Sequence, residues 1–337
     1  MARGRKIVGV AVLVVVAALL VGITFTIGWR PFLGPRIRPA TQRTFDRTPG
    51  RLARGEYLAN AVSGCIFCHS DHDFTQRGFS TAAGRAGAGM VFPLKDLPGQ
   101  LTAPNLTADP ETGLGRWTDD EIARAIREGV DRDGRTLFPL MPYEHFRHMS
   151  DEDLASVVVY LRSLPPVRST LPATHIIFPV SYLIRAVPQP VVSAVPPADS
   201  STPVERGAYL AEMAGCTDCH TPQKNGAPLQ GLEFGGGFVL EGPWGRVASA
   251  NITPDPSGIP YYDAQLFVQV MRTGYVKARP LNSIMPWPAY RDMTDENLRD
   301  LFAYLQTLKP VRHHVDNTEP PTLCRICNTS HGAGATN

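Results

Sequence analysis

Two five-residue stretches, Cys65-Ile-Phe-Cys68-His69 and Cys216-Thr-Asp-Cys219-His220, set the fold class of this 337-residue chain. Two cysteines separated by two residues on a helical turn place both sulfur atoms along one edge of a porphyrin, and the adjoining histidine can reach its iron. The string C-x-x-C-H is therefore typical of haem c attachment. It predicts two covalently bound haem c groups, with Cys65, Cys68, Cys216 and Cys219 as the attachment residues and His69 and His220 as iron ligands.

Other chemistries of a C-x-x-C string explain fewer of these residues. A single copy could be a thiol-redox motif or one half of a zinc site. Zinc would need four thiolate or imidazole ligands around one ion, but the two cysteine pairs lie in separate copies of a longer repeat. Structural disulfides suit an exported protein, yet they would leave His69 and His220 without a role. Haem attachment is the interpretation that uses all six residues.

The surroundings of the two motifs repeat as well. Four kinds of segment occur once in each copy. A Gly-x-Tyr-Leu-Ala segment begins at Gly55 and Gly207, and an Asn-(Leu/Ile)-Thr-x-Asp-Pro segment begins at Asn105 and Asn251. A Met-Pro-aromatic loop begins at Met141 and Met285, and a closing Met-(Ser/Thr)-Asp-Glu segment begins at Met149 and Met293. A set of segments used twice predicts one fold used twice. We expect one domain at residues 50–168 and a second at 204–316, joined by a Pro-rich linker at 169–203.

The closing segments carry the clearest helix signals. Ser150 and Thr294 are natural N-caps followed by acidic residues. Apolar residues then recur at helical spacing, at Leu154, Val157, Val158 and Leu161 and again at Leu298, Leu301, Phe302 and Leu305. Prolines stop both helices near Leu164 and Leu308, and Thr118-Asp-Asp-Glu121 predicts a capping box at the start of an earlier helix.

Composition limits the remaining choices. The chain holds 31 prolines and 30 glycines among its 337 residues, and both residue types resist the interior of helices and strands. The composition therefore disfavours a long parallel sheet or a plain helix bundle, and we expect a mainly α protein of short helices and long Gly/Pro loops. The apolar fraction of 43% and the net charge of only +2 exclude a disordered chain, and that charge gives no reason to propose nucleic acid as a partner.

The amino terminus predicts a membrane anchor. Residues 7–29 form a run of 23 uncharged, mostly aliphatic residues, preceded by Arg3, Arg5 and Lys6. Such a run can span the hydrocarbon layer, and the positive-inside rule then leaves the start of the chain cytoplasmic and exports the chain beyond Arg30. A cleaved signal peptide is the alternative, but its apolar region is shorter and ends near a small-residue cleavage site, which is missing here. We expect residues 1–30 to be a retained transmembrane anchor.

Each copy offers two aligned methionines for the second axial position of its iron. Met141 and Met285 lie in irregular Met-Pro-aromatic loops, where a thioether can point toward a metal. Met149 and Met293 directly precede a helix cap, a position that typically packs as a hydrophobic staple. We therefore predict Met141 and Met285 as iron ligands, with His72 or His148 as substitutes if Met141 is not one.

Histidine–methionine ligation raises the reduction potential of a haem and fills both axial positions of its iron. It therefore predicts outer-sphere electron transfer rather than chemistry at the metal, and no catalytic residues. Four loop residues, Asn105, Thr107, Asn251 and Thr253, could bind haem propionates or could simply form turns.

The combined motifs resemble one family over residues 50–316. They are similar to the multihaem cytochrome c subunits of membrane-bound alcohol, gluconate and related dehydrogenases. The resemblance implies two class I cytochrome c domains, with the family's proximal histidines at His69 and His220 and its axial methionines at Met141 and Met285. It also implies an electron carrier that takes electrons from a periplasmic dehydrogenase and passes them to quinone or to the respiratory chain.

We therefore predict an inner-membrane, single-pass dihaem cytochrome c with its haem domains on the periplasmic side. Its partners would be the membrane and redox proteins such as a periplasmic dehydrogenase, a quinol-oxidising complex or a terminal oxidase. The resembling subunits commonly have three haem domains and a C-terminal membrane segment, so the partner stays open. The alternatives are a dihaem peroxidase-type enzyme, which would need an open axial site, and a dihaem subunit of a haem–copper oxidase.

The tail at residues 317–337 contains a third C-x-x-C string, Cys324-Arg-Ile-Cys327, which lacks the haem histidine because Asn328 follows. We expect a local disulfide, as suits an oxidising compartment. A zinc site using His331 is an alternative for which the sequence offers no evident fourth ligand. A haem held by the two cysteines with a ligand from elsewhere is the third interpretation.

Overall fold

Short helices dominate the structure, as the composition predicts. The computed structural model describes residues 2–74 and 76–332. Within these residues the helices are α1 (Ala2–Phe25), α2 (Arg30–Leu33), α3 (Pro49–Tyr57), α4 (Cys65–Cys68), α5 (Asp119–Glu128), α6 (Tyr143–Phe146), α7 (Asp151–Ser163), α8 (Val180–Leu183), α9 (Pro203–Met213), α10 (Cys216–His220), α11 (Ala264–Thr273), α12 (Trp287–Tyr290) and α13 (Asp295–Thr307), with a π-helical turn η1 (Leu58–Val62) and a 3-10 turn η2 (Ile184–Ala186).

Strands occur only as short antiparallel pairs in the described part of the chain. The pairs are β1 (His72–Asp73) with β2 (Ser80–Thr81), β3 (Met90–Val91) with β5 (Thr102–Ala103), β4 (Gly99–Gln100) with β6 (His175–Ile176), β7 (Gln223–Lys224) with β8 (Ala227–Pro228), β9 (Val239–Gly242) with β10 (Gly245–Ala248), β11 (Tyr275–Val276) with β12 (Arg279–Pro280), and β13 (Thr322–Leu323) with β14 (Ser330–His331). Each pair joins a loop to a neighbouring segment, and none of the described pairs is part of a larger sheet.

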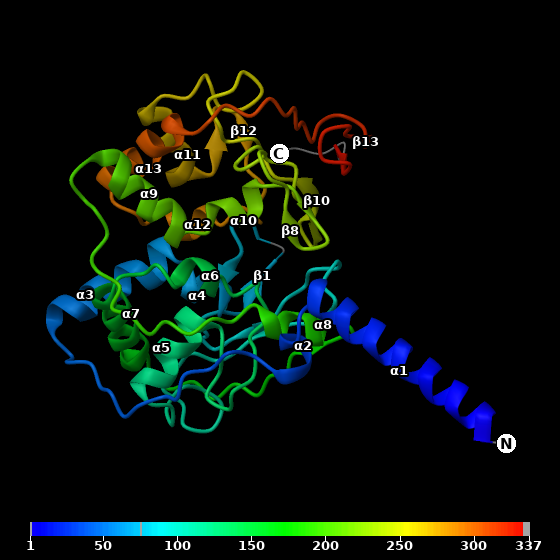
Figure 1. The fold of residues 1–337 in the computed structure, drawn as a ribbon. Helices are drawn as coiled ribbons and strands as arrows, with labels where there is room; N and C mark the ends of the chain where they lie inside the picture. Colours follow the sequence, from blue (N-terminus) through cyan, green and yellow to red (C-terminus); the bar gives the residue numbers. More distant parts are fainter. Residues whose placement is uncertain (1, 75, 333–337) are drawn as a thin grey trace.

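The helices gather into two lobes stacked on one another (Figure 1). The first lobe contains α3 to α7 and the second contains α9 to α13. In each lobe the first helix packs on the last, α3 on α7 and α9 on α13. Between them come the C-x-x-C-H turn, long loops and a middle helix in the same order. The repeated sequence segments therefore occupy matching places in the two lobes.

The predicted helix signals are confirmed. Ser150 Oγ accepts the Asp153 amide at 3.1 Å, and Thr294 Oγ1 accepts the Asn297 amide at 3.1 Å. At Thr118 both bonds of the capping box with Glu121 form. The eight apolar residues predicted to face inward from the closing helices are all buried: Leu154, Val157, Val158, Leu161, Leu298, Leu301, Phe302 and Leu305.

The two glycines of the Gly-x-Tyr-Leu-Ala segments allow the helix crossings. A Cβ at Gly55 would lie 1.9 Å from the Ser156 carbonyl oxygen of α7. A Cβ at Gly207 would lie 2.0 Å from the Asp300 carbonyl oxygen of α13. No side chain can occupy such a position, so glycine lets the two backbones touch.

The tyrosines of the same segments join the two lobes in a reciprocal way. Tyr57 of the first lobe accepts the Thr294 amide at 3.2 Å and donates to Asn297 Oδ1 at 2.5 Å, at the start of α13. Tyr209 of the second lobe donates to Asp153 Oδ2 at 2.7 Å, at the start of α7. Each lobe thus contacts the cap of the other's closing helix, which fixes their relative orientation.

The Pro-rich stretch at 169–203 joins the lobes and also lies along the first one. Its strand β6 pairs with β4, and the Val195 carbonyl accepts the Asp151 amide at 2.9 Å. The apolar part of this stretch, with α8, contacts α2 beside the base of α1. The side chains of Phe178 and Leu183 remain exposed there.

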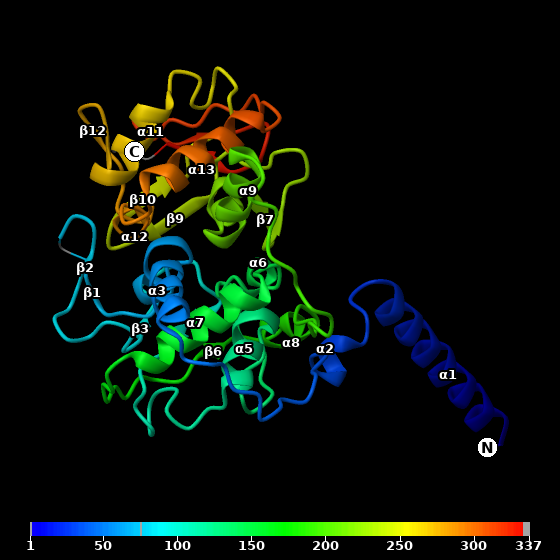
Figure 2. The ribbon, with the colours of Figure 1, turned by 90° about the vertical axis from the view of Figure 1, so that its left-hand side faces the viewer.

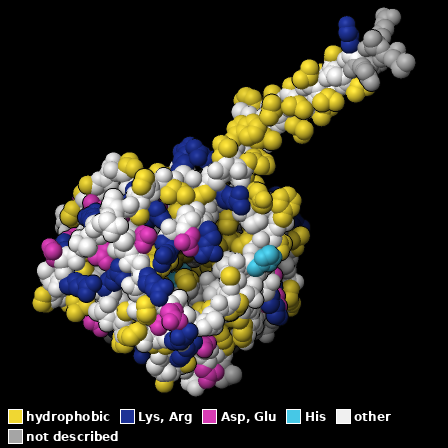
Figure 3. Space-filling view, turned by 90° about the horizontal axis from the view of Figure 1, so that it is seen from below, with side chains coloured by type: hydrophobic (Ala, Val, Ile, Leu, Met, Phe, Trp, Pro, Cys, Tyr) yellow, Lys and Arg dark blue, Asp and Glu magenta, His cyan; other side chains and the backbone are white. Residues whose placement is uncertain are grey.

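Helix α1 projects away from both lobes (Figures 1 and 2). Its Lys6–Phe25 segment is long and apolar enough to cross a membrane, and none of it is buried against the rest of the protein. Figure 3 shows its apolar side chains on all visible sides, in contrast to the mixed surface of the lobes. The helix ends at Phe25, before the predicted limit at Trp29, because Gly28 adopts a left-handed backbone with φ of 68°.

Candidate functional site

The two C-x-x-C-H motifs form equivalent short helices. Each follows a glycine with a left-handed backbone, Gly64 (φ 59°) before α4 and Gly215 (φ 61°) before α10. This conformation, which glycine adopts without strain, turns the chain sharply out of the preceding helix. The turn leaves both cysteines of a motif on one short helical segment, as the spacing predicts.

The histidines of the two motifs are held in the same way. His69 Nδ1 donates to the Pro104 carbonyl at 2.7 Å, and His220 Nδ1 donates to the Ala250 carbonyl at 2.7 Å. Burial lowers the pKa of both rings, so both stay neutral. A neutral ring with Nδ1–H bonded to a carbonyl presents the lone pair of Nε2, which is the arrangement of a metal-ligating histidine.

The four cysteines of the two motifs line a cavity that is partly open to the surface. Burial raises the pKa of Cys65, Cys216 and Cys219 to about 12 and that of Cys68 to about 11, so all four are neutral thiols. Cys68 is exposed, although protein surrounds it, because the surface that it exposes lines this cavity. The thiols therefore lie where a group that fills this cavity can reach them.

One connected cavity of about 1930 Å³ reaches both motifs. Its wall is mainly apolar and includes His69, His220, Met141 and Met285. Pockets for a single drug-sized ligand typically measure about 300–1,000 Å³. The cavity therefore has room for more than one large planar group.

The structure separates the two pairs of aligned methionines. Met141 and Met285 are half-buried, lie in irregular loops before α6 and α12, and line the cavity. Met149 and Met293 are buried in the apolar core at the start of the closing helices, although Met293 also lines the cavity. The difference in burial agrees with the predicted roles, and the ligation by Met141 and Met285 stays a prediction.

The two substitute histidines differ in position. His72 is buried, lines the cavity and bonds the Phe67 carbonyl at 2.5 Å through Nε2. His148 is exposed and lies 2.9 Å from Glu212 Oε1 on the second lobe. His72 alone therefore remains placed to substitute for Met141.

The loop residues considered for propionate binding serve the protein itself. The Asn105 amide donates to Thr112 Oγ1 at 3.0 Å and to the Val167 carbonyl at 2.7 Å. The Asn251 amide donates to the Val311 carbonyl at 2.7 Å. Both side chains tie their loop to the segment after the closing helix, which is the turn role that the sequence left open.

The tail does not contain the expected disulfide. Cys324 and Cys327 are free thiols, and each faces a histidine. The sequence pointed to His331, which lies beside Cys327, but it missed His313, which lies beside Cys324. Residues 333–337 of the predicted tail lie outside the described residues.

The residues around the cavity fit a covalently held haem. In each lobe two thiols, one oriented neutral imidazole and one thioether line a mainly apolar space. This set can form two thioether bonds and supply two axial ligands to iron.

Comparison with known proteins supports this assignment. The sequence model of the family described as Cytochrome c matches residues 204–309. The "Diheme cytochrome c-type" protein of Cereibacter sphaeroides is 30% identical over 217 residues, which cover 62% of this chain and 70% of that protein. The chain belongs to the cytochrome c family. As a cytochrome c it binds haem covalently and transfers electrons.

Two further relatives are parts of dehydrogenases. A nicotinate dehydrogenase subunit of Pseudomonas putida is 33% identical over 301 residues, 83% of this cytochrome c and 23% of that protein. The gluconate 2-dehydrogenase cytochrome c subunit of Pantoea cypripedii is 37% identical over 180 residues, 51% of this cytochrome c and 38% of that protein. The cytochrome c thus spans less than half the length of these two relatives.

Proposed function

We propose that this cytochrome c is a membrane-anchored dihaem carrier, made of two class I cytochrome c domains, that relays electrons on the periplasmic side of the inner membrane. It would link a dehydrogenase or a respiratory complex to a second redox partner. The observation that carries the proposal is the pair of equivalent C-x-x-C-H turns opening into one cavity. A haem bound at each turn supplies a one-electron iron couple.

The chain's own residues would hold, orient and insulate the two groups. Cys65 and Cys68 would attach the first haem, and Cys216 and Cys219 the second. The carbonyls of Pro104 and Ala250 keep the two histidines in the ligating orientation. The axial ligands would be His69 with Met141 and His220 with Met285.

The placement of the two turns supports a relay. Cys68 of the first lobe lies close enough to Cys219 of the second to affect the pKa of its thiol. The two attachment sites therefore lie near each other and line the same cavity. Electrons could pass between the groups without leaving the protein.

Helix α1 supports the membrane assignment. The 20 residues of Lys6–Phe25 extend about 30 Å at 1.5 Å per residue, which matches the hydrocarbon layer. The basic residues before it favour a cytoplasmic start and a periplasmic remainder. Four exposed apolar side chains lie near the base of α1: Phe32 and Leu33 on α2, Leu183 on α8 and Phe178 just before α8. Apolar side chains at this place can contact the membrane surface.

The proposed partner is a dehydrogenase catalytic subunit. The names of the nicotinate and gluconate relatives place them in dehydrogenases, and the two alignments cover 83% and 51% of this chain. The two relatives belong to dehydrogenases with different substrates, so the proposal names no substrate.

The test uses the full-length chain purified in detergent. Mass spectrometry should show two added haem c groups, and a redox titration should resolve two one-electron steps. Neither reduced haem should bind carbon monoxide, and a dehydrogenase subunit should co-purify. A single haem would contradict the dihaem proposal, while ready carbon monoxide binding would favour a peroxidase-type enzyme.

A further inference from the structure

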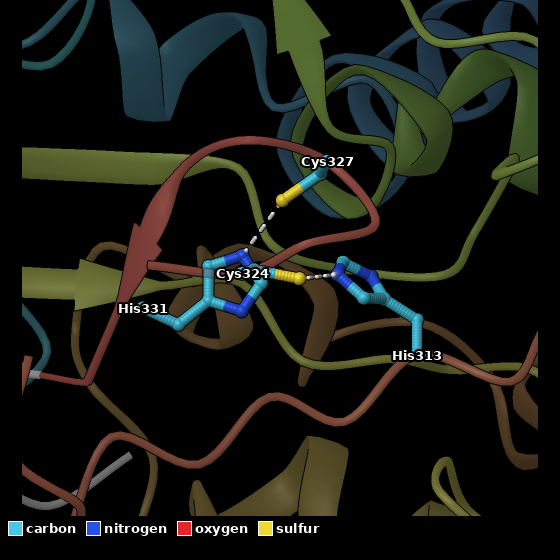
Figure 4. Close-up of side chains that lie close together, drawn as sticks. All are labelled: His313, Cys324, Cys327 and His331. Carbon is cyan, nitrogen blue, oxygen red and sulfur yellow. Dashed lines mark hydrogen bonds between the residues drawn. The ribbon is translucent and has the colours of Figure 1, made fainter. Parts of the chain in front are cut away.

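Four side chains gather at the tail of the chain, away from the cysteines of the cavity. Cys324 and Cys327 lie in the turn between β13 and β14, His331 lies on β14, and His313 follows α13 (Figure 4). One ligand atom from each lies within 4.8 Å of all the others. Two sulfurs and two imidazole nitrogens form the donor set typical of structural zinc sites.

The distances suit a tetrahedral metal. The Cys324 sulfur lies 3.4 Å from His313 Nε2, and the Cys327 sulfur lies 3.0 Å from His331 Nε2. Zinc–sulfur bonds of about 2.3 Å and zinc–nitrogen bonds of about 2.0 Å at tetrahedral angles separate the ligands by about 3.3–3.8 Å. The four side chains thus need only small shifts to enclose one ion.

The hairpin backbone presents the two sulfurs as a pair. Cys324 donates its amide to the Thr329 carbonyl and accepts the Asn328 amide at its own carbonyl, both at 3.0 Å. Asn328 takes a left-handed backbone with φ of 56°, which closes the turn. The Ile326 amide points at the Cys324 sulfur at 3.4 Å, where it would stabilise the charge of a thiolate.

A hydrogen bond on the side of the ring away from the cysteines orients His313. His313 is fully buried, and its Nδ1 donates to the Gly235 carbonyl at 2.9 Å, so Nε2 carries the lone pair that faces Cys324. A Cβ at Gly237 would lie 2.6 Å from His313 Cε1 and 2.9 Å from His331 Nε2. Glycine at 237 thus leaves the space in which the two rings converge.

The tail has little else to hold it folded. Its apolar residues Leu323 and Ile326 are 66% and 50% exposed. Polar contacts attach it to the second lobe, where Arg246 donates to the Ser330 and Gly332 carbonyls and Asn317 pairs with the backbone of Ala248. A short segment without an apolar core typically needs a disulfide or a metal. A disulfide would leave the two buried histidines without a function.

We propose that Cys324, Cys327, His313 and His331 bind one structural zinc ion that fastens the tail to the second lobe. The site does not depend on either haem. It lies close to the second C-x-x-C-H turn. Gly236, which lies between Gly235 and Gly237, donates its amide to the His220 carbonyl at 2.7 Å. Zinc there would stiffen the Gly235–Gly237 loop, which contacts the C-x-x-C-H turn.

The experiment measures zinc and haem together in the detergent-purified full-length chain. Inductively coupled plasma mass spectrometry should give one zinc per two haem irons. Zinc K-edge absorption should show two sulfurs at about 2.3 Å and two nitrogens at about 2.0 Å, and haem iron does not interfere at that edge. His313→Gln and Cys327→Ser should lower the zinc content at least tenfold and speed proteolysis of the tail, with the haem content unchanged.

The control is His314→Gln, which changes the neighbouring exposed histidine and removes it from the exposed group His314, Asp316 and Glu319. It should retain the full zinc content. The proposal is overturned if the wild type lacks zinc and mass spectrometry finds a Cys324–Cys327 disulfide, if another metal fills the site, or if zinc is lost in His314→Gln instead. Because haem is counted separately, these outcomes do not affect the dihaem proposal.

Discussion

At the residue scale, one hydrogen bond prepares each of the two motif histidines for its role. A free imidazole could present either nitrogen, and a charged one could present neither. The carbonyl oxygens of Pro104 and Ala250 each accept Nδ1–H, and burial keeps the ring neutral. The same arrangement recurs at His313, with the Gly235 carbonyl as acceptor.

Met285→Ala tests the axial ligand of the second haem. Loss of the thioether should lower the reduction potential of one haem and open one iron, because methionine ligation raises the potential and fills the sixth position. About half of the haem should then bind carbon monoxide, and Met141→Ala should do the same for the other half. A redox titration and carbon monoxide difference spectra measure both effects.

The control for this prediction is Met293→Leu, at the buried methionine that aligns with Met149. Leucine keeps the volume of the core, so both potentials should stay unchanged. If Met293→Leu lowers a potential and Met285→Ala does not, Met293 is the ligand and our choice is wrong.

At the scale of elements, each lobe depends on the crossing of its first and last helices. The caps at Thr118, Ser150 and Thr294 start the helices locally, but the crossings depend on backbone contact at Gly55 and Gly207. Salt bridges flank both contacts, from Arg54 to Asp153 and from Arg206 to Asp300. The absence of a side chain at one position of the first helix therefore sets how closely the first and last helices of a lobe can pack.

Gly55→Ala should destabilise the first lobe. The added Cβ would meet the Ser156 carbonyl at 1.9 Å and force α3 away from α7, and overpacking of this kind typically costs about 1–3 kcal/mol. Urea unfolding followed by circular dichroism measures the loss. Gly50→Ala in the same helix is the control, since its Cβ meets nothing within 4 Å. Equal stability of the two variants would show that the crossing tolerates a side chain.

At the scale of the whole molecule, the two lobes are joined around the C-x-x-C-H turns. His145 of α6 lies 3.0 Å from Glu212 and 2.7 Å from Asp218, and Asp218 is one of the variable residues of the second motif. Burial opposes the charged ring, but hydrogen bonds to the two carboxylates prevail and raise the pKa of His145 to about 10. A charged histidine thus bridges the lobes at neutral pH.

The bridge predicts a pH dependence of stability. Because the folded pKa of about 10 exceeds the usual value of 6.5, the stabilisation is complete below pH 6.5 and is lost as the pH rises toward 10. Asp218 is half exposed to solvent, so solvent screening limits the loss to about 1–2 kcal/mol. Thermal unfolding between pH 6 and 10 should show this decline in the wild type.

His145→Gln should be less stable at pH 6 and should lack most of the decline. His175→Gln, at an exposed histidine of β6, should follow the wild type. A decline of equal size in His145→Gln would assign the pH dependence to other groups.

Much of the fold follows from short-range sequence signals. The C-x-x-C-H turns, the caps and the apolar spacing of the closing helices depend on residues within one or two helical turns of each other, so neighbours in the sequence suffice to predict them. The glycine-rich loops are likewise local, since they need only positions that tolerate a left-handed backbone.

The sequence predicts which residues make up the candidate haem site, but it does not predict the cavity that they line. The sequence identified the motif cysteines and histidines and the loop methionines, because each lies in a repeated segment. It could not show that both motifs open into one cavity, or that Asn105 and Asn251 use their amide donors on the backbone. Those facts depend on how long loops return to the helices.

Local patterns in the chain are enough to predict a repeat of short helices with two C-x-x-C-H motifs and an apolar amino-terminal segment. Tertiary packing alone sets how the two copies meet, through Tyr57, Tyr209 and His145, and which residue completes the tail cluster. His313 is 11 residues from Cys324 and belongs to no motif. It reaches the cysteines because α13 and the Gly235–Gly237 loop place it there, and packing between distant segments leaves no local pattern in the sequence.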